Sequence, residues 1–291
     1  MNKQQIRSSL LLLLGAVIWG SAFVAQSVGM DYIGPFTFNA VRSLIGTVSL
    51  LPLILILDRR KKRSAVTRAQ KKEFIKACLI CGTVLCGATM CQQIGLKYTT
   101  VGKAGFITAM YIVLVPVLGV FLGRKPALRI WFCVLLACVG LYFLCINEGF
   151  SIEKGDLLML GAAILFAFQI LVIAHYAPKV DSLKLSAGQF FVSGVISLVI
   201  MFLVETPRIP DICAAWLPLL YAGVLSSGVA YTLQIVGERD ADPAIASLAM
   251  SMESVFSVLA GWLILGQVLS PREWIGCGLM FTAIVISHTH A

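Results

Sequence analysis

One acidic residue, Glu253, lies deep inside a long apolar stretch of this 291-residue sequence. It follows Pro243 by ten residues, and the residues from 243 to 265 are otherwise largely apolar. An ionised side chain at the centre of a membrane span costs about 2.5 kcal/mol or more. A residue kept at that cost is a candidate for substrate binding or proton exchange, so Glu253 is expected to have a partner.

Arg42 is the cation whose depth in the membrane could match that of Glu253. It lies about six residues into the apolar run 36–57, roughly 6 Å from the centre of that span by helical rise. In one interpretation the two residues form a permanent buried pair that joins two helices. In a second, one of them meets substrate charge in a cavity, or Glu253 exchanges a proton. In a third, the two positions are unrelated and unpaired. Because burial disfavours an ionised carboxylate without a cation, proton exchange would require the Arg42 contact to break.

Other polar and aromatic side chains inside the apolar runs could form the wall of a cavity. Hydrogen bonding between helices is the alternative use of the polar ones, and packing or lipid contact that of the aromatic ones. Asn39 and Gln189 lie at similar depth, and we select them together with Gln169. The polar set is Gln26, Asn39, Gln92, Gln93, Gln169, His175, Gln189, Gln234 and Ser251, and the aromatic set is Trp19, Phe23, Phe38, Phe106, Tyr111, Phe166, Phe168, Tyr231 and Trp262.

The composition places these residues in a membrane protein. The sequence is 59% hydrophobic and 13% charged, with a mean hydropathy of +0.92, whereas a soluble domain carries about 25% charged residues. Ten apolar runs are long enough to cross about 30 Å of hydrocarbon as helices. They are 10–28, 36–57, 74–95, 104–122, 129–146, 157–175, 186–204, 216–236, 243–265 and 273–288.

The positive charge is placed as in a membrane protein rather than a nucleic-acid-binding one. The formal charge is +9, but the basic run within 58–63 lies between two apolar runs, where a cytoplasmic loop is usually basic. With the N-terminus inside, most of the 23 Lys and Arg residues lie on the cytoplasmic side. We therefore expect a multi-pass protein of the cell (inner or plasma) membrane with both termini in the cytoplasm and the lipid bilayer as its surroundings.

The sequence contains an internal repeat. Gly123 and Trp131 recur as Gly266 and Trp274, 143 residues later in each case. Five predicted spans lie in each copy, and because five is odd, the second copy enters the membrane from the opposite side. Inverted repeats are common in secondary transporters, which bind substrate between the two copies near the midplane.

The openings of the two copies also correspond. Residues 14–18 and 160–164 have similar sequences. We therefore predict two repeats, residues 1–147 and 148–291, each of five helices. The fold class predicted is an all-α integral membrane protein, with ten transmembrane helices arranged as two inverted five-helix repeats around a central cavity.

Several segments resemble the drug/metabolite transporter superfamily, in its ten-span EamA branch. The resemblance implies a ten-helix inverted repeat with a central cavity that moves small metabolites, often outward. Because Trp19, Phe23 and Tyr111 fall in the matching segments, we select them as cavity aromatics. The segments are Gly15–Phe23, Pro35 with Arg42, Gly102–Pro116, Met252–Val255 and Leu265-Gly266.

The sequence departs from the family pattern at two positions near the end of the second copy. Gln267 stands where the family usually has an acid after Leu-Gly, which removes one partner of an outer ion pair. Ser254 stands where the family often has proline after the intramembrane acid, which predicts a less kinked helix.

The function predicted is secondary transport, with export of small polar or amphipathic metabolites such as amino acids by alternating access, coupled to protons in one version. An uncoupled facilitator is the alternative, followed by a membrane-embedded enzyme or sensor. Enzymatic motifs such as HExxH, GxSxG and the phosphate-binding P-loop are absent, and we find no second deep carboxylate. We predict no enzyme activity, no metal or cofactor and no nucleic-acid partner. Since ten spans can enclose a cavity unaided, we expect a monomer.

Overall fold

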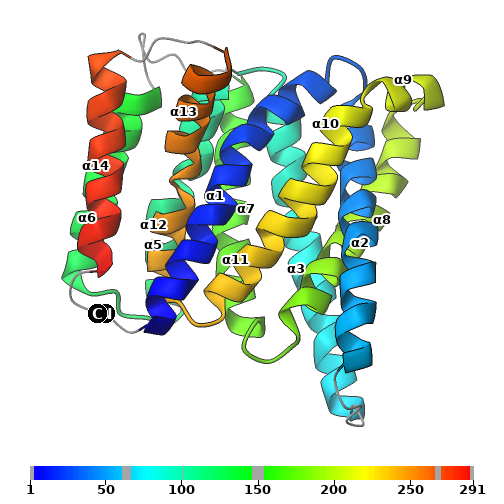
Figure 1. Ribbon diagram of the computed structural model, residues 1–291, viewed down its shortest axis with the longest axis horizontal. Helices are drawn as coiled ribbons and strands as arrows, with labels where there is room; N and C mark the ends of the chain where they lie inside the picture. Colours follow the sequence, from blue (N-terminus) through cyan, green and yellow to red (C-terminus); the bar gives the residue numbers. More distant parts are fainter. Residues whose placement is uncertain (1–2, 61–66, 100, 146–153, 266–269, 289–291) are drawn as a thin grey trace.

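The computed structural model describes residues 3–60, 67–99, 101–145, 154–265 and 270–288, and these residues form helices without strands (Figure 1). Seven helical segments are long and apolar enough to cross a membrane, and 128–144 and 243–259 are shorter apolar helices. The chain thus has the make-up of a multi-pass membrane protein. In order, the elements are α1 (Lys3–Gly29), α2 (Pro35–Arg60), α3 (Arg68–Gly95), α4 (Val101–Ala109), α5 (Tyr111–Phe121), α6 (Leu128–Cys145), α7 (Lys154–Tyr176), α8 (Ser182–Val204), α9 (Ile209–Ala214), α10 (Trp216–Leu220), the π-helix η1 (Tyr221–Ala230), α11 (Tyr231–Glu238), α12 (Pro243–Met250), α13 (Glu253–Leu265) and α14 (Pro271–His288).

Two of the predicted spans are interrupted helices. The run 104–122 divides into α4 and α5 at Met110, and the run 243–265 divides into α12 and α13 just before Glu253. At both places the backbone makes tighter i to i+3 hydrogen bonds. The N–H of Met110 donates to Ile107 O over 3.2 Å, and that of Met252 to Ala249 O over 3.4 Å.

The second interruption has a local cause in the sequence. The Ser251 hydroxyl donates to Leu248 O over 2.8 Å, a contact that tends to bend helices. The helix is therefore interrupted here even though Ser254 takes the place of the proline common in the family. The two interruptions lie about one repeat length apart, so both copies break their fourth apolar run at matching positions.

Corresponding helices of the two halves make corresponding contacts, each with the opposite half. α2 lies against α8, and α6 lies against α14. α1 of the first half packs on α12 and α13 of the second, just as α7 of the second half packs on α4 and α5 of the first. α1 also contacts η1 and α11, as α7 contacts α3. In Figure 1, α1 begins at the lower end and α7 at the upper end, so the halves run in opposite directions.

Helices α2 and α8 are fastened to one another at both ends. At the upper end, the Glu205 carboxylate after α8 accepts hydrogen bonds from the backbone N–H groups of Phe36 and Thr37, at 3.1 and 2.8 Å. At the lower end, Lys184 pairs with Asp58 over 2.8 Å. Since an anion at a helix N-terminus is favourable, Glu205 also caps the first turn of α2.

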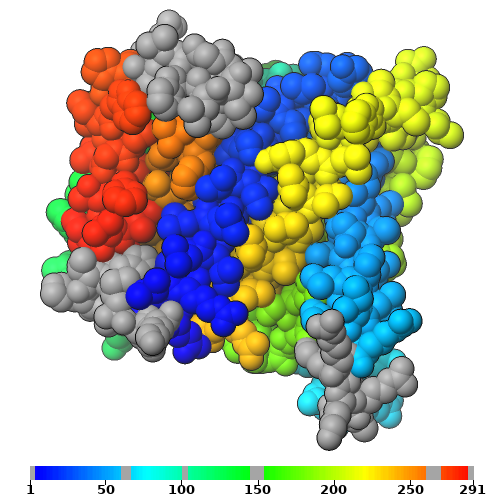
Figure 2. Space-filling model, in the orientation of Figure 1, coloured from blue at the N-terminus to red at the C-terminus, as the bar shows by residue number. Residues whose placement is uncertain are grey.

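The outward faces of the helices are apolar. The side chains of Leu55, Leu157, Phe202 and Phe281 are each about 60% exposed, from 59% to 67%. Figure 2 shows α1 crossing this face between α13 and the α10–η1–α11 stretch. Large contiguous apolar surfaces are unusual on soluble proteins, so these faces suit contact with lipid tails. The expected domain boundary at 147 and 148 lies outside the described residues.

Candidate functional site

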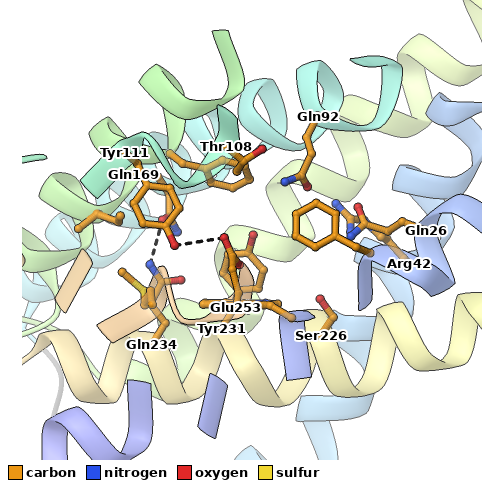
Figure 3. Close-up of a pocket in the computed structure, with 15 residues that line it drawn as sticks. Gln26, Arg42, Gln92, Thr108, Tyr111, Gln169, Ser226, Tyr231, Gln234 and Glu253 are labelled. Atoms are coloured by element: carbon orange, nitrogen blue, oxygen red, sulfur yellow. Dashed lines mark hydrogen bonds between the residues drawn. The ribbon is translucent and has the colours of Figure 1, made fainter. Parts of the chain in front are cut away.

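A cavity lies between the two halves, in the middle of the helix bundle. Its volume is about 50 Å³, which is room for a few water molecules. Both interrupted helices contribute to it, as do the first helices of each half (Figure 3). The lining residues are Trp19, Phe23, Gln26, Arg42, Gln92, Thr108, Tyr111, Phe166, Gln169, Ile170, Ser226, Tyr231, Gln234, Met250 and Glu253.

Glu253 is held at the start of one interrupted helix by a residue at the start of the other. It is the first residue of α13, and Tyr111 is the first residue of α5. The Tyr111 hydroxyl donates a hydrogen bond to Glu253 Oε1 over 3.2 Å. The partial positive charge at the N-terminus of α13 also favours a carboxylate there. The interruption therefore places a carboxyl group in the cavity and gives it a hydrogen-bond donor.

Close contact with α1 fixes the backbone of Glu253. A Cβ atom at Gly20 would lie 2.7 Å from Glu253 O and 2.7 Å from Ser257 N. Both neighbours are backbone atoms, so only glycine allows α1 to approach α13 this closely. Trp19 precedes Gly20 and lines the cavity, and its ring makes an edge-to-face contact with Tyr231 at 4.9 Å between centroids.

Arg42 is oriented by a polar network on the side away from the cavity. Its Nε donates to Asn39 Oδ1 over 2.9 Å. The amide of Asn39 in turn donates to Thr89 and Ser197, at 3.0 and 3.2 Å. The guanidinium group also lies 5.9 Å from the centre of the Phe38 ring. These contacts leave the outer nitrogens of Arg42 for the cavity, where Gln26 lies beside it (Figure 3).

Arg42 and Glu253 line the same cavity without pairing. Within the described residues no salt bridge joins them. Each has its own neutral partner instead, Asn39 for Arg42 and Tyr111 for Glu253. The interpretation of a permanent buried pair is therefore not what this structure shows. The cavity wall therefore holds a guanidinium group and a carboxyl group that do not contact each other, and Arg42 and Glu253 are the basic and acidic residues of its described lining.

Six of the eight selected residues line the cavity, and two do not. Asn39 lies behind Arg42 and bonds to it. Gln189 is fully buried, and neither amide atom has a hydrogen-bond partner among the described residues. The six that line the cavity are Trp19, Phe23, Arg42, Tyr111, Gln169 and Glu253. The side chain of Trp262 and the whole of Gln267 lie outside the described part of the chain.

Helical spacing could have found several of the lining residues that were not selected. Trp19, Phe23 and Gln26 share one face of α1 at intervals of four and three residues. On α7, Phe166 and Ile170 lie on the same face as Gln169. A rule that extended each selected residue along its own helix face would have added Gln26, Phe166 and Ile170.

Glu238 is another buried carboxylate, which lies at the end of a span rather than in its middle. The predicted span ended at residue 236 and left Glu238 in a charged turn, but α11 continues to Glu238. Its side chain is 1% exposed and accepts a 2.7 Å hydrogen bond from Gln234 Nε2. Elsewhere the described residues contain no group of three or more His, Cys, Asp or Glu that could hold a metal ion.

Comparison with known proteins matches both halves of the chain to one family. Residues 6–146 and 153–289 each match the EamA-like transporter family. An uncharacterized transporter of Archaeoglobus fulgidus is 32% identical over 97% of this chain and 86% of its own. The threonine/homoserine exporter RhtA of Escherichia coli K12 is 25% identical over 94% of this chain and 88% of its own. One solved crystal structure, 18% identical, has the same fold, with a TM-score of 0.79 over 97% of this chain and 96% of that one.

Proposed function

The chain belongs to the EamA-like transporter family, and from this we propose that it exports small zwitterionic metabolites, such as amino acids, by alternating access. The observation that carries the proposal is that Arg42 and Glu253 line one cavity and form no salt bridge within the described part of the chain. A substrate carboxylate would bind Arg42, whose planar guanidinium suits a carboxylate. A substrate ammonium group would bind Glu253 through charge-assisted hydrogen bonds.

The relatives support transport and suggest the chemical class of the substrate. RhtA is named as an exporter of threonine and homoserine, both of which carry one carboxylate and one ammonium group. At 25% identity this name does not transfer by itself. The support for this chain comes from the two charges in its own cavity, which correspond to those two groups.

We further propose how the chain sits in the membrane. If each interrupted helix crosses once, together with the π-helical stretch from α10 to α11, the chain makes ten crossings as two inverted five-helix repeats. α1 begins and α14 ends at the lower end in Figure 1, where α2 ends and α3 begins with basic residues. The excess of positive charge on cytoplasmic loops then places both termini in the cytoplasm of the inner or plasma membrane. The cavity forms within one chain, which supports a monomer.

Alternating access would follow from the way the halves pack. α1 and α7 each contact the interrupted helix of the opposite half, so a rocking motion of one half would open one end as it closes the other. A proton gradient would drive export in this mechanism. The alternative is an uncoupled facilitator with the same cavity, which would equilibrate its substrate without accumulating it.

A matched series of ligands tests the proposal on purified protein in liposomes. Threonine is compared with an amine that lacks its carboxylate and with a hydroxy acid that lacks its ammonium group. We expect threonine or a similar amino acid to be transported, and each singly charged analogue to bind at least about tenfold more weakly, since a hydrogen bond to a charged group contributes about 1.5–3 kcal/mol. Equal transport of the amine or the acid would contradict a zwitterion site.

Two substitutions show which end of the substrate each charge binds. Arg42→Gln should abolish the preference for the amino acid over the amine, and Glu253→Gln the preference over the acid. Arg208→Gln is the control, because Arg208 is 77% exposed and pairs only with neighbouring Asp211 among the described residues. If both cavity variants keep the selectivity of the unmodified protein, the substrate does not bind between these two charges.

A further inference from the structure

Glu238 is a buried carboxylate outside the wall of the cavity, and the cavity site does not use it. Its side chain is 1% exposed, and no cation pairs with it among the described residues. We propose that Glu238 is a proton-carrying site, linked to the cavity through Gln234 and Gln169 and separate from the substrate-binding Glu253. The inference rests on the proposed transport function and assigns its coupling proton to one residue.

A chain of hydrogen bonds leads from the cavity to Glu238. Gln234 Nε2 donates to Gln169 Oε1 over 3.1 Å and to Glu238 Oε1 over 2.7 Å. Both glutamines line the cavity, and the bond between them is drawn in Figure 3 on the same side as Tyr111. A change in the position of Gln169 in the cavity would therefore reach Glu238 through a single shared amide group.

Two acceptor atoms in the hydrogen-bonded series Gln169–Gln234–Glu238 lack partners in the described part of the chain, and they indicate that a proton is missing from the series. Glu238 Oε2 and Gln234 Oε1 are both buried, and neither has a hydrogen-bond partner among the residues that the structure describes. If Glu238 is ionised, both atoms are acceptors and neither has a donor. A proton on Glu238 turns its carboxyl group into a donor and removes a buried charge that no cation compensates. A proton needs no additional space, unlike a metal ion or an ammonium group.

Among the described residues, the groups around Glu238 give it no fixed counter-ion. The side chain of Arg239, the next residue, is exposed, and Arg7 and Arg239 line a surface pocket with Asp240. Lys184 is paired with Asp58. The titratable and charged groups near this end of α11 lie on its packing partners and in the turn that follows it. They are Arg7 on α1, Cys81 on α3, His175 and Tyr176 on α7, Lys184 on α8, Arg239 and Asp240 after α11, and Asp242 before α12.

The proton step balances without any further reactant. An O–H bond forms on Glu238 as a hydronium ion from one side of the membrane becomes water, and this bond breaks when water on the other side accepts the proton. Gln169 Nε2 has no partner among the described residues, so it can donate a hydrogen bond to an acceptor on a bound substrate. That contact would draw Gln169 away from Gln234. The amide of Gln234 would then shift, and its hydrogen bond to Glu238, which favours the ionised carboxylate, would weaken.

The test compares Glu238→Gln with Asp240→Asn in liposomes. Two rates are measured for each variant, uphill flux driven by a pH gradient and exchange of labelled amino acid without a gradient. We expect the ratio of uphill flux to exchange to fall at least tenfold in Glu238→Gln and to stay unchanged in Asp240→Asn, whose side chain is exposed. An unchanged ratio in Glu238→Gln would overturn the proposal. Absence of any amino-acid exchange by the unmodified protein would instead contradict the proposed function.

A spectroscopic measurement keeps the proposal testable if Glu238→Gln does not fold. Infrared difference spectra between acid and alkaline buffer report the carbonyl stretch of protonated carboxyl groups. Glu238→Asp keeps an acid and should shift one such band, and Glu253→Gln should leave that band in place. If every protonated band in the buried range disappears in Glu253→Gln, Glu238 carries no proton and the inference is wrong.

Discussion

The two interrupted helices share a backbone design and differ in the side chain at the break. α4 and α5 meet at Met110 and α12 and α13 meet before Glu253, in both cases through i to i+3 hydrogen bonds. The first residue after the break is Tyr111 in one half and Glu253 in the other, and the two bond to each other. The break is therefore a repeated structural device, and only its second copy carries charge.

The second helices of the two halves differ in the same way. Arg42 lies seven residues after Pro35 at the start of α2, and Gln189 lies seven residues after Ser182 at the start of α8. Arg42 lines the cavity, whereas the buried amide of Gln189 has no hydrogen-bond partner in the described part of the chain. Each half thus supplies one ionisable residue of opposite type, the basic Arg42 from the first and the acidic Glu253 from the second. A symmetric scaffold with this asymmetric chemistry suits a substrate that has two different ends.

The largest loss of transport is expected at Gly20, where α1 contacts the backbone of α13. Gly20→Ala would place a Cβ 2.7 Å from the backbone oxygen of Glu253, so α1 must shift and Glu253 must move with it. We expect loss of nearly all transport, measured as amino-acid uptake in liposomes. The matched control is Gly161→Ala on α7, where a Cβ meets no atom within 4 Å and transport should be kept. Equal loss in both variants would show that the close approach at Gly20 has no special role.

A smaller effect is expected behind Arg42. Asn39→Leu removes the acceptor of Arg42 Nε and leaves a buried charged donor unsatisfied, which costs about 1.5–3 kcal/mol. Binding of an amino acid should weaken by about tenfold or more, measured by titration on purified protein. Ser186 holds the matching position on α8 and bonds only to Thr232 among the described residues, so Ser186→Ala should change binding far less. Similar losses would mean that both halves position the ligand.

The hydrogen bond between the two breaks is expected to matter less still. Tyr111→Phe removes the 3.2 Å bond to Glu253 but leaves the ring and the carboxylate, a change of about 1 kcal/mol in affinity. The loss should appear for ligands with an ammonium group and be absent for acids without one. Binding constants for the amine and the acid measure this directly. An equal loss for both ligands would place Tyr111 in general packing rather than in support of Glu253.

The fold was more readable from the sequence than the site was. Apolar runs and the repeated Gly123 and Trp131 pattern predict helices and two related halves, because both depend on local composition and spacing. Which side chains face the cavity and which lie behind them, as Asn39 lies behind Arg42, depends on side-chain direction. Depth in the membrane, which is what the sequence provides, does not determine it. Glu238 was missed because charge at the edge of an apolar run usually marks a loop, whereas α11 continues for two more residues.

The smallest effect on ligand binding is expected at Gln189, the counterpart of Arg42 in the second half, where the expected change is in the stability of the folded protein. Both amide atoms of Gln189 are buried without a partner among the described residues, and each unsatisfied buried polar group costs about 1–3 kcal/mol. Gln189→Leu should therefore raise the melting temperature of the purified protein slightly and leave binding unchanged. Gln189→Arg, which copies Arg42 without an Asn39 equivalent, should lower it, since an unpaired buried charge costs about 3–5 kcal/mol. If Gln189→Leu lowers stability or binding instead, Gln189 has a partner in another state of the transport cycle, and the second half contributes more than packing to the site.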